Sequence, residues 1–238
     1  DVVRSAGEAF GDFQMMLSDF DAAQLFYTIP DFHDTRKRYA KLKADAAEDP
    51  CGRVGEVRDC LDWLLSVEDE ACRLTDLYNA GELPLRVTHN DTKLNNVLLD
   101  RATRKPLCVI DLDTVMPGLA AFDFGDSIRF GASTAAEDET DLSKVEMSLS
   151  LFETYARGFL SACGSALSPL ERETLPLGAK LMTLECGVRF LTDYLSGDTY
   201  FRIHRPNHNL DRCRTQFKLV ADMEQKQKQM QAIIARIG

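Results

Sequence analysis

The sequence predicts an α+β fold that is mostly helical, with one small β-hairpin at its centre. Apolar residues recur at helical spacing towards both ends of the chain. In the middle, two short apolar runs at 96–99 and 107–110 are joined by a polar connector, a pattern typical of a hairpin with a longer loop. No internal repeat or flexible linker divides the 238 residues. We therefore expect a single domain over residues 1–238.

The composition excludes several classes of protein. A formal net charge of −10, without a long Lys/Arg run, argues against nucleic acid or an anionic membrane as a partner. Seven cysteines, an odd number without CxxC or zinc-like spacing, indicate free thiols in a reducing compartment. No apolar run is long enough to span a membrane. We expect a soluble, cytoplasmic protein.

Three helical regions are predicted before the hairpin. Apolar residues at three-to-four spacing predict a helix within residues 1–27, and a Pro-containing break at 28–34 follows it. A charged helix is predicted at 35–47. A strongly amphipathic helix is predicted at 54–79, with Gly81 as its C-terminal stop.

The chain after the hairpin is predicted to be a loop followed by helices. Gly and Pro make 114–133 an ordered loop with short helical turns, and loops of this length are usually functional. Ser143 with Glu146 and Ser168 with Glu171 have capping-box spacing, which predicts helices at about 144–162 and 169–195. A last helix from about residue 210 turns polar near its end, and we expect that end to extend into solvent.

The predicted hairpin gathers oxygen-bearing side chains. A hairpin brings the end of its second strand back beside the start of its first. Asp91, Asn96 and Asp111 should therefore lie at one end of the small sheet, with Asp113 as a further candidate. Packing alone does not explain such a set of polar side chains.

His89, Asp91 and Asn96 have the spacing of a kinase catalytic loop, H-x-D with an Asn five residues after the Asp. Phosphoryl transfer requires a carboxylate that orients and deprotonates the attacking hydroxyl, and Asp91 suits this role. Asn96 and Asp111 offer the oxygen ligands that Mg²⁺ (magnesium) prefers. We expect His89 to orient this catalytic loop by hydrogen bonding rather than to transfer a proton.

Asp123, Phe124 and Gly125 spell DFG, the metal-binding triplet of protein kinases, but no predicted strand precedes them. Asp111 closes the second strand of the hairpin, so we assign the metal to Asp111. We expect Asp123 to tie its own loop to the catalytic loop, and Asp113 to support the same region.

The segments THNDTKLNNVLLD, VIDLDTVMPG and FDFGDSIRFGAS resemble the aminoglycoside phosphotransferase and choline kinase superfamily, and within it the N-acetylhexosamine 1-kinases. The resemblance implies the C-terminal lobe of a protein-kinase-like fold, in which ATP and Mg²⁺ lie between two lobes. It implies that Asp91 is the catalytic base and that Asn96 and Asp111 hold Mg²⁺. It also implies a set of sugar-binding residues in the C-terminal lobe: Thr114, Phe130, Arg189, Asp193 and Tyr200.

Some of these positions also have simpler interpretations. Glu185, Arg189 and Asp193 lie four residues apart, which fits an internal salt ladder along one helix face. Phe130 fits either a core position or a ring that packs on the apolar face of a sugar.

The nucleotide-binding half of such a kinase is not recognisable in this sequence. No glycine-rich loop follows a strand near the N-terminus, and no V-A-I-K-like lysine occurs. We expect the chain to depend on its missing N-terminal lobe, and alone to bind ATP poorly and turn over little or nothing. Other acceptors (an aminoglycoside, choline or homoserine) and a non-catalytic lobe that binds a sugar or a partner remain alternatives.

Overall fold

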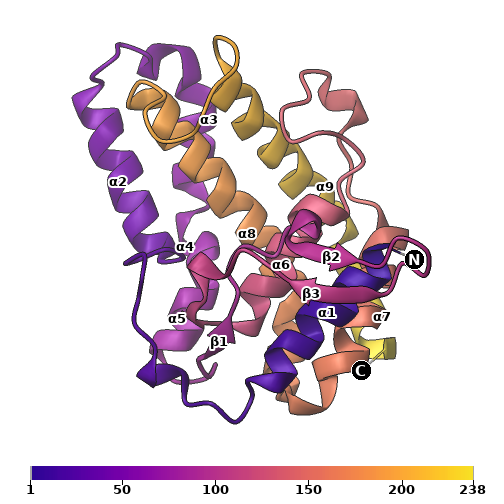
Figure 1. Ribbon diagram of the computed structural model, residues 1–238. Helices are drawn as coiled ribbons and strands as arrows, with labels where there is room; N and C mark the ends of the chain where they lie inside the picture. Colours follow the sequence, from indigo (N-terminus) through magenta and orange to yellow (C-terminus); the bar gives the residue numbers. More distant parts are fainter. Residues whose placement is uncertain (1, 238) are drawn as a thin grey trace.

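The computed structural model describes residues 2–237, and Figure 1 shows its course. The helices are α1 (Val2–Met16), α2 (Thr35–Glu48), α3 (Arg58–Ser66), α4 (Glu68–Ala71), α5 (Arg73–Asn79), α6 (Ala120–Gly131), α7 (Leu149–Cys163), α8 (Pro169–Leu195) and α9 (His208–Ile237). The strands are β1 (Arg86–Thr88), β2 (Val97–Leu99), β3 (Pro106–Val109) and β4 (Met116–Gly118). Short 3₁₀ turns occur at Ala22–Gln24, Val54–Val57, Leu94–Asn96, Leu112–Thr114, Leu142–Lys144 and Gly164–Ala166. The predicted α+β, mostly helical class is confirmed.

The predicted hairpin is present as β2 and β3, which pair antiparallel with Leu98 opposite Cys108. One face of this hairpin packs on the core through Val97 and Val109, whereas Leu98 and Cys108 are exposed on the other face. A second antiparallel pair, β1 with β4, was not predicted. Each of its strands has only three residues, and β4 contains a proline, so the period-two signal of a strand is too short to read.

The long helix α8 organises the helical part, and Figure 1 shows it running through the middle of the molecule. It packs against α6, α9 and α2, while α1 packs against α7 and lies beside β2 and β3. Two glycines allow α6 and α8 to approach closely. A Cβ on Gly125 would lie 2.3 Å from the backbone oxygen of Gly178, and one on Gly178 would lie 2.4 Å from that of Ala121.

The loop with short helical turns predicted at 114–133 is wrong in that most of this stretch forms β4 and the 12-residue helix α6. The helix was hidden because both of its sides are buried. Polar side chains such as Asp123, Asp126 and Ser127 are buried beside Phe124 and Ile128, so no polar face marks the helical period.

Several predicted helix ends also move. The Ser168–Glu171 capping box is confirmed, and α8 has the predicted bounds. Ser143 instead lies in a 3₁₀ turn, and α7 begins after Ser148, whose side chain accepts a hydrogen bond from the backbone N–H of Leu151. The first helix ends at Met16, and the helix predicted at 54–79 is divided among a 3₁₀ turn, α3, α4 and α5.

The C-terminal end of α9 does not extend into solvent. Met230, Ile233 and Ile234 are buried in the same hydrophobic cluster as Phe10 and Phe159. Their three-to-four spacing forms an apolar stripe between the Gln and Lys residues, which explains why the polar composition alone was misleading. Over residues 2–237, no helix is long and apolar enough to cross a membrane. Residues 1 and 238, included in the predicted domain, lie outside the described chain.

Candidate functional site

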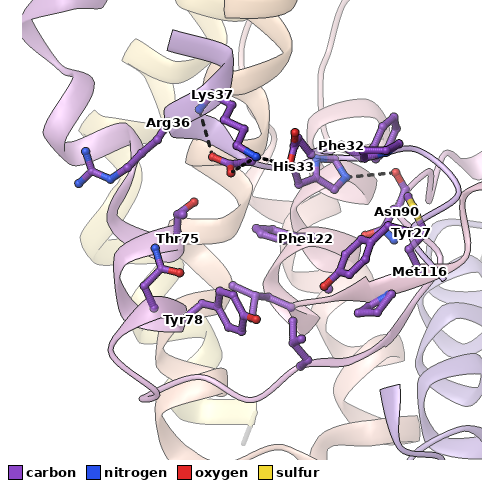
Figure 2. Close-up of a pocket in the computed structure, with 18 of the residues that line it drawn as sticks. Tyr27, Phe32, His33, Arg36, Lys37, Thr75, Tyr78, Asn90, Met116 and Phe122 are labelled. Carbon is purple, nitrogen blue, oxygen red and sulfur yellow. Dashed lines mark hydrogen bonds and ion pairs between the residues drawn. The ribbon is translucent and has the colours of Figure 1, made fainter. Parts of the chain in front are cut away.

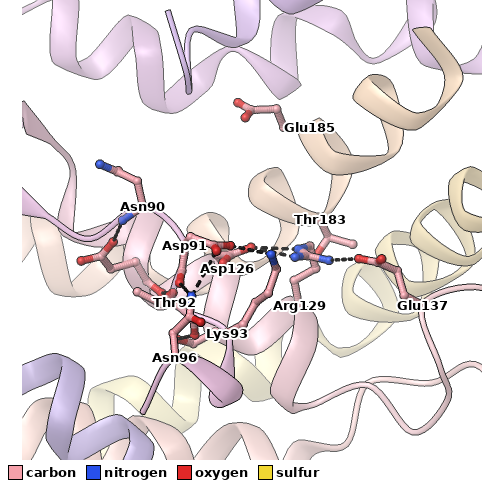
Figure 3. Close-up of polar contacts among 12 residues, drawn as sticks. Asn90, Asp91, Thr92, Lys93, Asn96, Asp126, Arg129, Glu137, Thr183 and Glu185 are labelled. Atoms are coloured by element: carbon pink, nitrogen blue, oxygen red, sulfur yellow. Dashed lines mark hydrogen bonds and ion pairs between the residues drawn. The ribbon is translucent and has the colours of Figure 1, made fainter. Parts of the chain in front are cut away.

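Asp91 lies just after β1, at the start of the loop that leads into β2. Its Oδ1 forms an ion pair with Nζ of Lys93 at 2.7 Å, and its Oδ2 accepts a hydrogen bond from Nδ2 of Asn96 at 3.1 Å. The same Asn96 nitrogen donates to the backbone oxygen of Asp91 at 2.8 Å. Figure 3 shows these three side chains converging. The structure thus places Asp91 and Asn96 in direct contact, across the five-residue spacing of the motif.

Lys93 was not singled out in the sequence. It is half-buried, and burial lowers the pKa of Lys93, but the hydrogen bond with Asp91 and the charges of Asp91 and Asp126 together raise that pKa more, so the net change is upward. The ammonium group is therefore firmly charged next to the candidate base. A basic residue two positions after the Asp of an H-x-D motif was the signal that could have identified it.

His89 is fully buried and holds the catalytic loop through both ring nitrogens. Nε2 lies 2.9 Å from the backbone oxygen of Ile110, and Nδ1 lies 3.3 Å from the backbone N–H of Asp91. Phe10 and Phe13 pack edge-on against the ring, with centroids 5.4 and 5.8 Å away. Both nitrogens are engaged by backbone, so His89 is placed to orient the loop.

Asp123 is a fully buried residue of α6, and its carboxylate contacts the backbone of the catalytic loop. Its carboxylate accepts hydrogen bonds from the backbone N–H groups of His89 (3.0 Å) and Asn90 (2.8 Å) and from Nε2 of Gln14 (2.9 Å). Burial raises the pKa of Asp123, and these three donors oppose that rise. Asn90 has a left-handed backbone (φ 65°), and Asp123 fixes both amides beside this bend.

The DFG triplet thus has a structural explanation at each position. Asp123 binds the catalytic loop, Phe124 is fully buried in the core, and Gly125 permits the close approach of α6 to α8.

Asp111 lies two residues after the end of β3. The backbone N–H of its neighbour Ile110 donates to the backbone oxygen of Asn96 at 2.9 Å. Asp111 has a left-handed backbone (φ 63°) and an exposed side chain. Within residues 2–237, no donor is recorded for the Asp111 carboxylate or for the side-chain oxygen of Asn96. Asn96 immediately precedes β2. The side chains of Asn96 and Asp111 both carry the kind of oxygen that a hard cation such as Mg²⁺ prefers, and Mg²⁺ is usually held by one or two carboxylates plus phosphates. The described residues contain no group of three or more His, Cys, Asp or Glu side chains that could hold a metal ion.

A cavity of about 450 Å³ opens beside Asp91. We call it the acceptor cavity. Three of the predicted sugar-binding residues line it together with Asp91: Thr114, Arg189 and Tyr200. Thr114 also belongs to the catalytic-loop scaffold, because its hydroxyl donates to the backbone oxygen of His89 at 2.7 Å.

A charge network contributes Asp126, Arg129 and Glu137 to the lining of the acceptor cavity. Figure 3 shows the contacts among these three side chains. Arg129 pairs with Asp126 at 2.9 Å and with Glu137 at 2.7 Å. Burial raises the pKa of Asp126, but the charges of Arg129 and Lys93 lower it more, so the net shift is downward. Oδ2 of Asp126 is buried without a hydrogen-bond partner in the described part of the chain.

The salt ladder considered for α8 does not form among the described residues. Glu185 is buried, with its oxygens 2.8 Å from Nδ1 of His33 and 2.8 Å from the hydroxyl of Thr35. Arg189 instead lies near three aromatic rings, those of Phe32 (5.2 Å), Phe201 (5.4 Å) and Tyr200 (5.9 Å). Its guanidinium group keeps its N–H donors available on the cavity side.

Two predicted sugar-binding residues are not placed in the acceptor cavity. The carboxylate of Asp193 accepts hydrogen bonds from the backbone N–H groups of Thr199, Tyr200 and Phe201 and from Nδ2 of Asn209. Asp193 therefore shapes the loop that carries Tyr200. Phe130 is 40% exposed on α6 and is not among the residues that line the cavity.

Asp113, predicted to support this region, is exposed, and only its backbone oxygen is engaged, by the Thr28 hydroxyl at 3.1 Å.

A larger, mainly apolar cavity of about 640 Å³ lies on the other side of His33 and Asn90, and Figure 2 shows a close-up of it. Its lining comes from α2, α5, β4 and the start of α6, and includes Tyr27, Tyr78 and Phe122. Phe32, His33 and Asn90 line both cavities. Asp91 lines the smaller of these two cavities and not the larger one.

Comparison with known proteins gives a match to the phosphotransferase enzyme family (APH) over residues 1–158. The match spans well over half of the chain, and the chain belongs to this family. The mostly helical fold with small antiparallel sheets is compatible with the C-terminal lobe of such a phosphotransferase. Phosphotransferases of this kinase-like kind generally use ATP and Mg²⁺. The matched residues include Asp91, Asn96 and Asp111 but end before Arg189 and Tyr200.

Proposed function

We propose that the chain is the catalytic and acceptor-binding part of a phosphotransferase that moves the γ-phosphoryl group of ATP to a sugar hydroxyl. The preferred acceptor is an N-acetylhexosamine, phosphorylated at its anomeric hydroxyl. The observation that carries the proposal is the acceptor cavity, where Asp91 shares one space with Thr114, Arg189 and Tyr200.

The mechanism assigned to the catalytic loop follows from its contacts. Asp91 accepts the proton of the sugar hydroxyl as the oxygen attacks the γ-phosphorus. Lys93, held at 2.7 Å from Asp91, supplies positive charge next to the transferring group. His89 keeps the loop in register. Asn96 and Asp111 would hold Mg²⁺, which when bound neutralises the phosphate charge.

The polar groups of the acceptor cavity favour a neutral, hydroxyl-rich acceptor. A sugar hydroxyl both donates and accepts hydrogen bonds, and the cavity lining includes groups of each kind: the carboxylate of Asp91 as acceptor and the guanidinium of Arg189 as donor. The cavity also holds more cationic than anionic side chains. The cationic ones are Lys93, Arg129, Arg189, Arg202 and Arg212, and the anionic ones are Asp91, Asp126, Glu137 and Glu185. This balance disfavours choline and the aminoglycosides, which are cations.

The exposed face of the hairpin is assigned to binding of the nucleotide base. The face of β2 and β3 that carries Leu98 and Cys108 is uncovered and partly apolar, as the base of ATP requires. The glycine-rich loop that would cover the phosphates would come from an N-terminal lobe outside this sequence.

The proposal is tested by measuring sugar binding and phosphate transfer separately. Titration calorimetry of this chain with N-acetylglucosamine, N-acetylgalactosamine and choline should give saturable binding of the sugars only. Transfer from ATP is measured on the protein joined to a nucleotide lobe. Asp91→Asn should lower turnover by about 10²–10⁴-fold, because it removes the base, while sugar affinity changes little. Transfer to choline but not to sugars, or full turnover by Asp91→Asn, would overturn the proposal.

A further inference from the structure

A third, smaller cavity of about 210 Å³ adjoins the acceptor cavity on the far side of Arg189. Arg38 of α2 and Arg189 of α8 both line it, and Arg189, Tyr200 and Phe201 also line the acceptor cavity. Two guanidinium groups from helices far apart in the sequence therefore flank one small space, next to the candidate site but outside it.

Neither guanidinium has a carboxylate partner in residues 2–237. Elsewhere the half-buried and buried cations near the site are paired, as Arg129 is with Asp126 and Glu137. Arg38 donates from Nη2 to the backbone oxygen of Phe32 at 2.7 Å, but its Nε is buried without a hydrogen-bond partner. Burial lowers the pKa of Arg38, and the charge of Arg189 lowers it further, so the two groups repel each other.

The acidic groups nearby are already occupied. Both oxygens of Glu185 are engaged, by His33 and Thr35. Asp193, which also lines this cavity, accepts four N–H donors, three of them from the backbone. The remaining cation of the cavity, Lys41, is neutralised by Asp45 at 2.8 Å. These hydrogen bonds leave both carboxylates charged, but neither Glu185 nor Asp193 forms an ion pair with Arg38 or Arg189 within residues 2–237.

We propose that Arg38 and Arg189 form a binding site for an oxyanion of the phosphate type, separate from the acceptor site but sharing Arg189 with it. Planar guanidinium groups match the oxygens of phosphate, and an anion between them would relieve their repulsion. The phosphate is either free inorganic phosphate or a phosphate carried by a sugar in the acceptor cavity. The oxyanion site does not depend on which acceptor the enzyme uses.

The test is titration calorimetry of this chain with sodium phosphate at about pH 7 in a phosphate-free buffer, with sodium chloride as the ionic-strength control. We expect saturable binding, and a loss of about tenfold or more in affinity in Arg38→Gln. Arg38→Lys keeps the charge without the planar guanidinium group, so its affinity for phosphate should lie between those of the wild type and Arg38→Gln. Arg172→Gln is the matched control, since Arg172 is half-buried and lies about 25 Å from Arg189 along α8.

The site would be overturned if the wild type showed no saturable phosphate binding, or if wild type and Arg38→Gln bound phosphate equally well. Equal losses in Arg38→Gln and Arg172→Gln would do the same, because they would indicate a general charge effect. Circular dichroism and a cooperative urea-unfolding transition verify that each variant is folded. If Arg38→Gln is not folded, Arg38→Lys decides: affinity equal to that of the wild type overturns the site.

A second set of ligands separates the two sources of phosphate. If the phosphate is carried by the sugar, N-acetylglucosamine 6-phosphate should bind at least about tenfold more tightly than inorganic phosphate, and Arg38→Gln should remove that gain. If it is free, the phosphosugar should bind no more tightly than inorganic phosphate. Failure of sugar binding with intact phosphate binding would reject the proposed acceptor and leave the oxyanion site standing.

Discussion

The two walls of the acceptor cavity are built in opposite ways. On the catalytic-loop wall, buried polar groups find partners within the protein: Asp123 accepts three hydrogen bonds, and Thr114 and His89 bind backbone. On the α8 wall, Arg189 has aromatic neighbours but no carboxylate partner in the described chain. The comparison indicates that the first wall fixes geometry, whereas the second is left ready to bind. Substitutions should therefore cost stability on one wall and affinity on the other.

The largest effect is expected for Asp123→Ala. The substitution leaves the backbone N–H groups of His89 and Asn90 and the amide of Gln14 without their acceptor in a fully buried place. We expect the free energy of unfolding to fall by about 3–5 kcal/mol, measured by urea denaturation. Asp113→Ala is the control, because its exposed carboxylate should contribute less than about 0.5 kcal/mol. A loss of similar size in both variants would contradict the scaffold role.

Gly125→Ala should have the next largest effect. The added Cβ would lie 2.3 Å from the backbone oxygen of Gly178, so α6 must move away from α8. We expect a loss of about 1–3 kcal/mol in the free energy of unfolding. At Gly55 a Cβ meets nothing within 4 Å, and Gly55→Ala should leave the unfolding midpoint almost unchanged. If the two alanine variants unfolded alike, helix contact would not be the reason for the glycine.

Arg189→Gln probes the opposite wall. Because Arg189 forms no ion pair with the described residues, its loss should change stability by less than about 0.5 kcal/mol. Affinity for N-acetylglucosamine should fall about tenfold, which corresponds to about 1.4 kcal/mol. Phe130→Ala serves for comparison, since Phe130 does not line the acceptor cavity, and calorimetry should detect no change in sugar affinity. Equal affinity losses in both variants would remove the distinction between these positions.

Arg86→Met should have the smallest effect, and one that depends on pH. Burial raises the pKa of Glu171, but its hydrogen bonds with Arg86 and Ser168 lower it more, so the pKa in the folded state is depressed. A depressed carboxyl pKa stabilises the fold above the unfolded-state pKa, and this stabilisation is lost as the pH falls through the folded-state pKa. The difference in stability between wild type and Arg86→Met should be about 1 kcal/mol at about pH 7 and should shrink towards about pH 3.

The exposed Arg4–Glu8 pair is the control for this pH series. Arg4→Met should have little effect at either pH, because side chains on the surface are screened by solvent. A constant difference between wild type and Arg86→Met across the range would show that Glu171 is not the titrating group.

Local signals in the sequence were sufficient for some elements. Ser168, Pro169 and Glu171 define the start of α8 by capping chemistry within four residues, and the apolar runs of the hairpin are equally local. The helix α6 was missed because its polar residues are buried with distant partners, and Gln14 reaches Asp123 across 109 positions. Proximity of that kind has no local signature.

The same reasoning applies to the site. The H-x-D motif and the following Asn located Asp91 and Asn96, which are five residues apart, and the structure places them in contact. Arg38 was not identified as a site residue, because nothing in a charged helix indicates that one of its arginines turns towards α8. Phe130 and Asp193 were taken from a family resemblance, and the structure places both outside the acceptor cavity.

The residues shared by the two large cavities have a consequence for substrate range. Phe32 and His33 belong to the segment between α1 and α2, and a single carboxylate, that of Glu185, anchors His33 and Thr35. Two side chains of this segment, Phe32 and His33, together with Asn90, line both the cavity of about 450 Å³ and that of about 640 Å³. Trimming the Phe32 or His33 side chain would join these spaces without touching Asp91. Directed evolution towards bulkier acceptors therefore has a short, well-defined target.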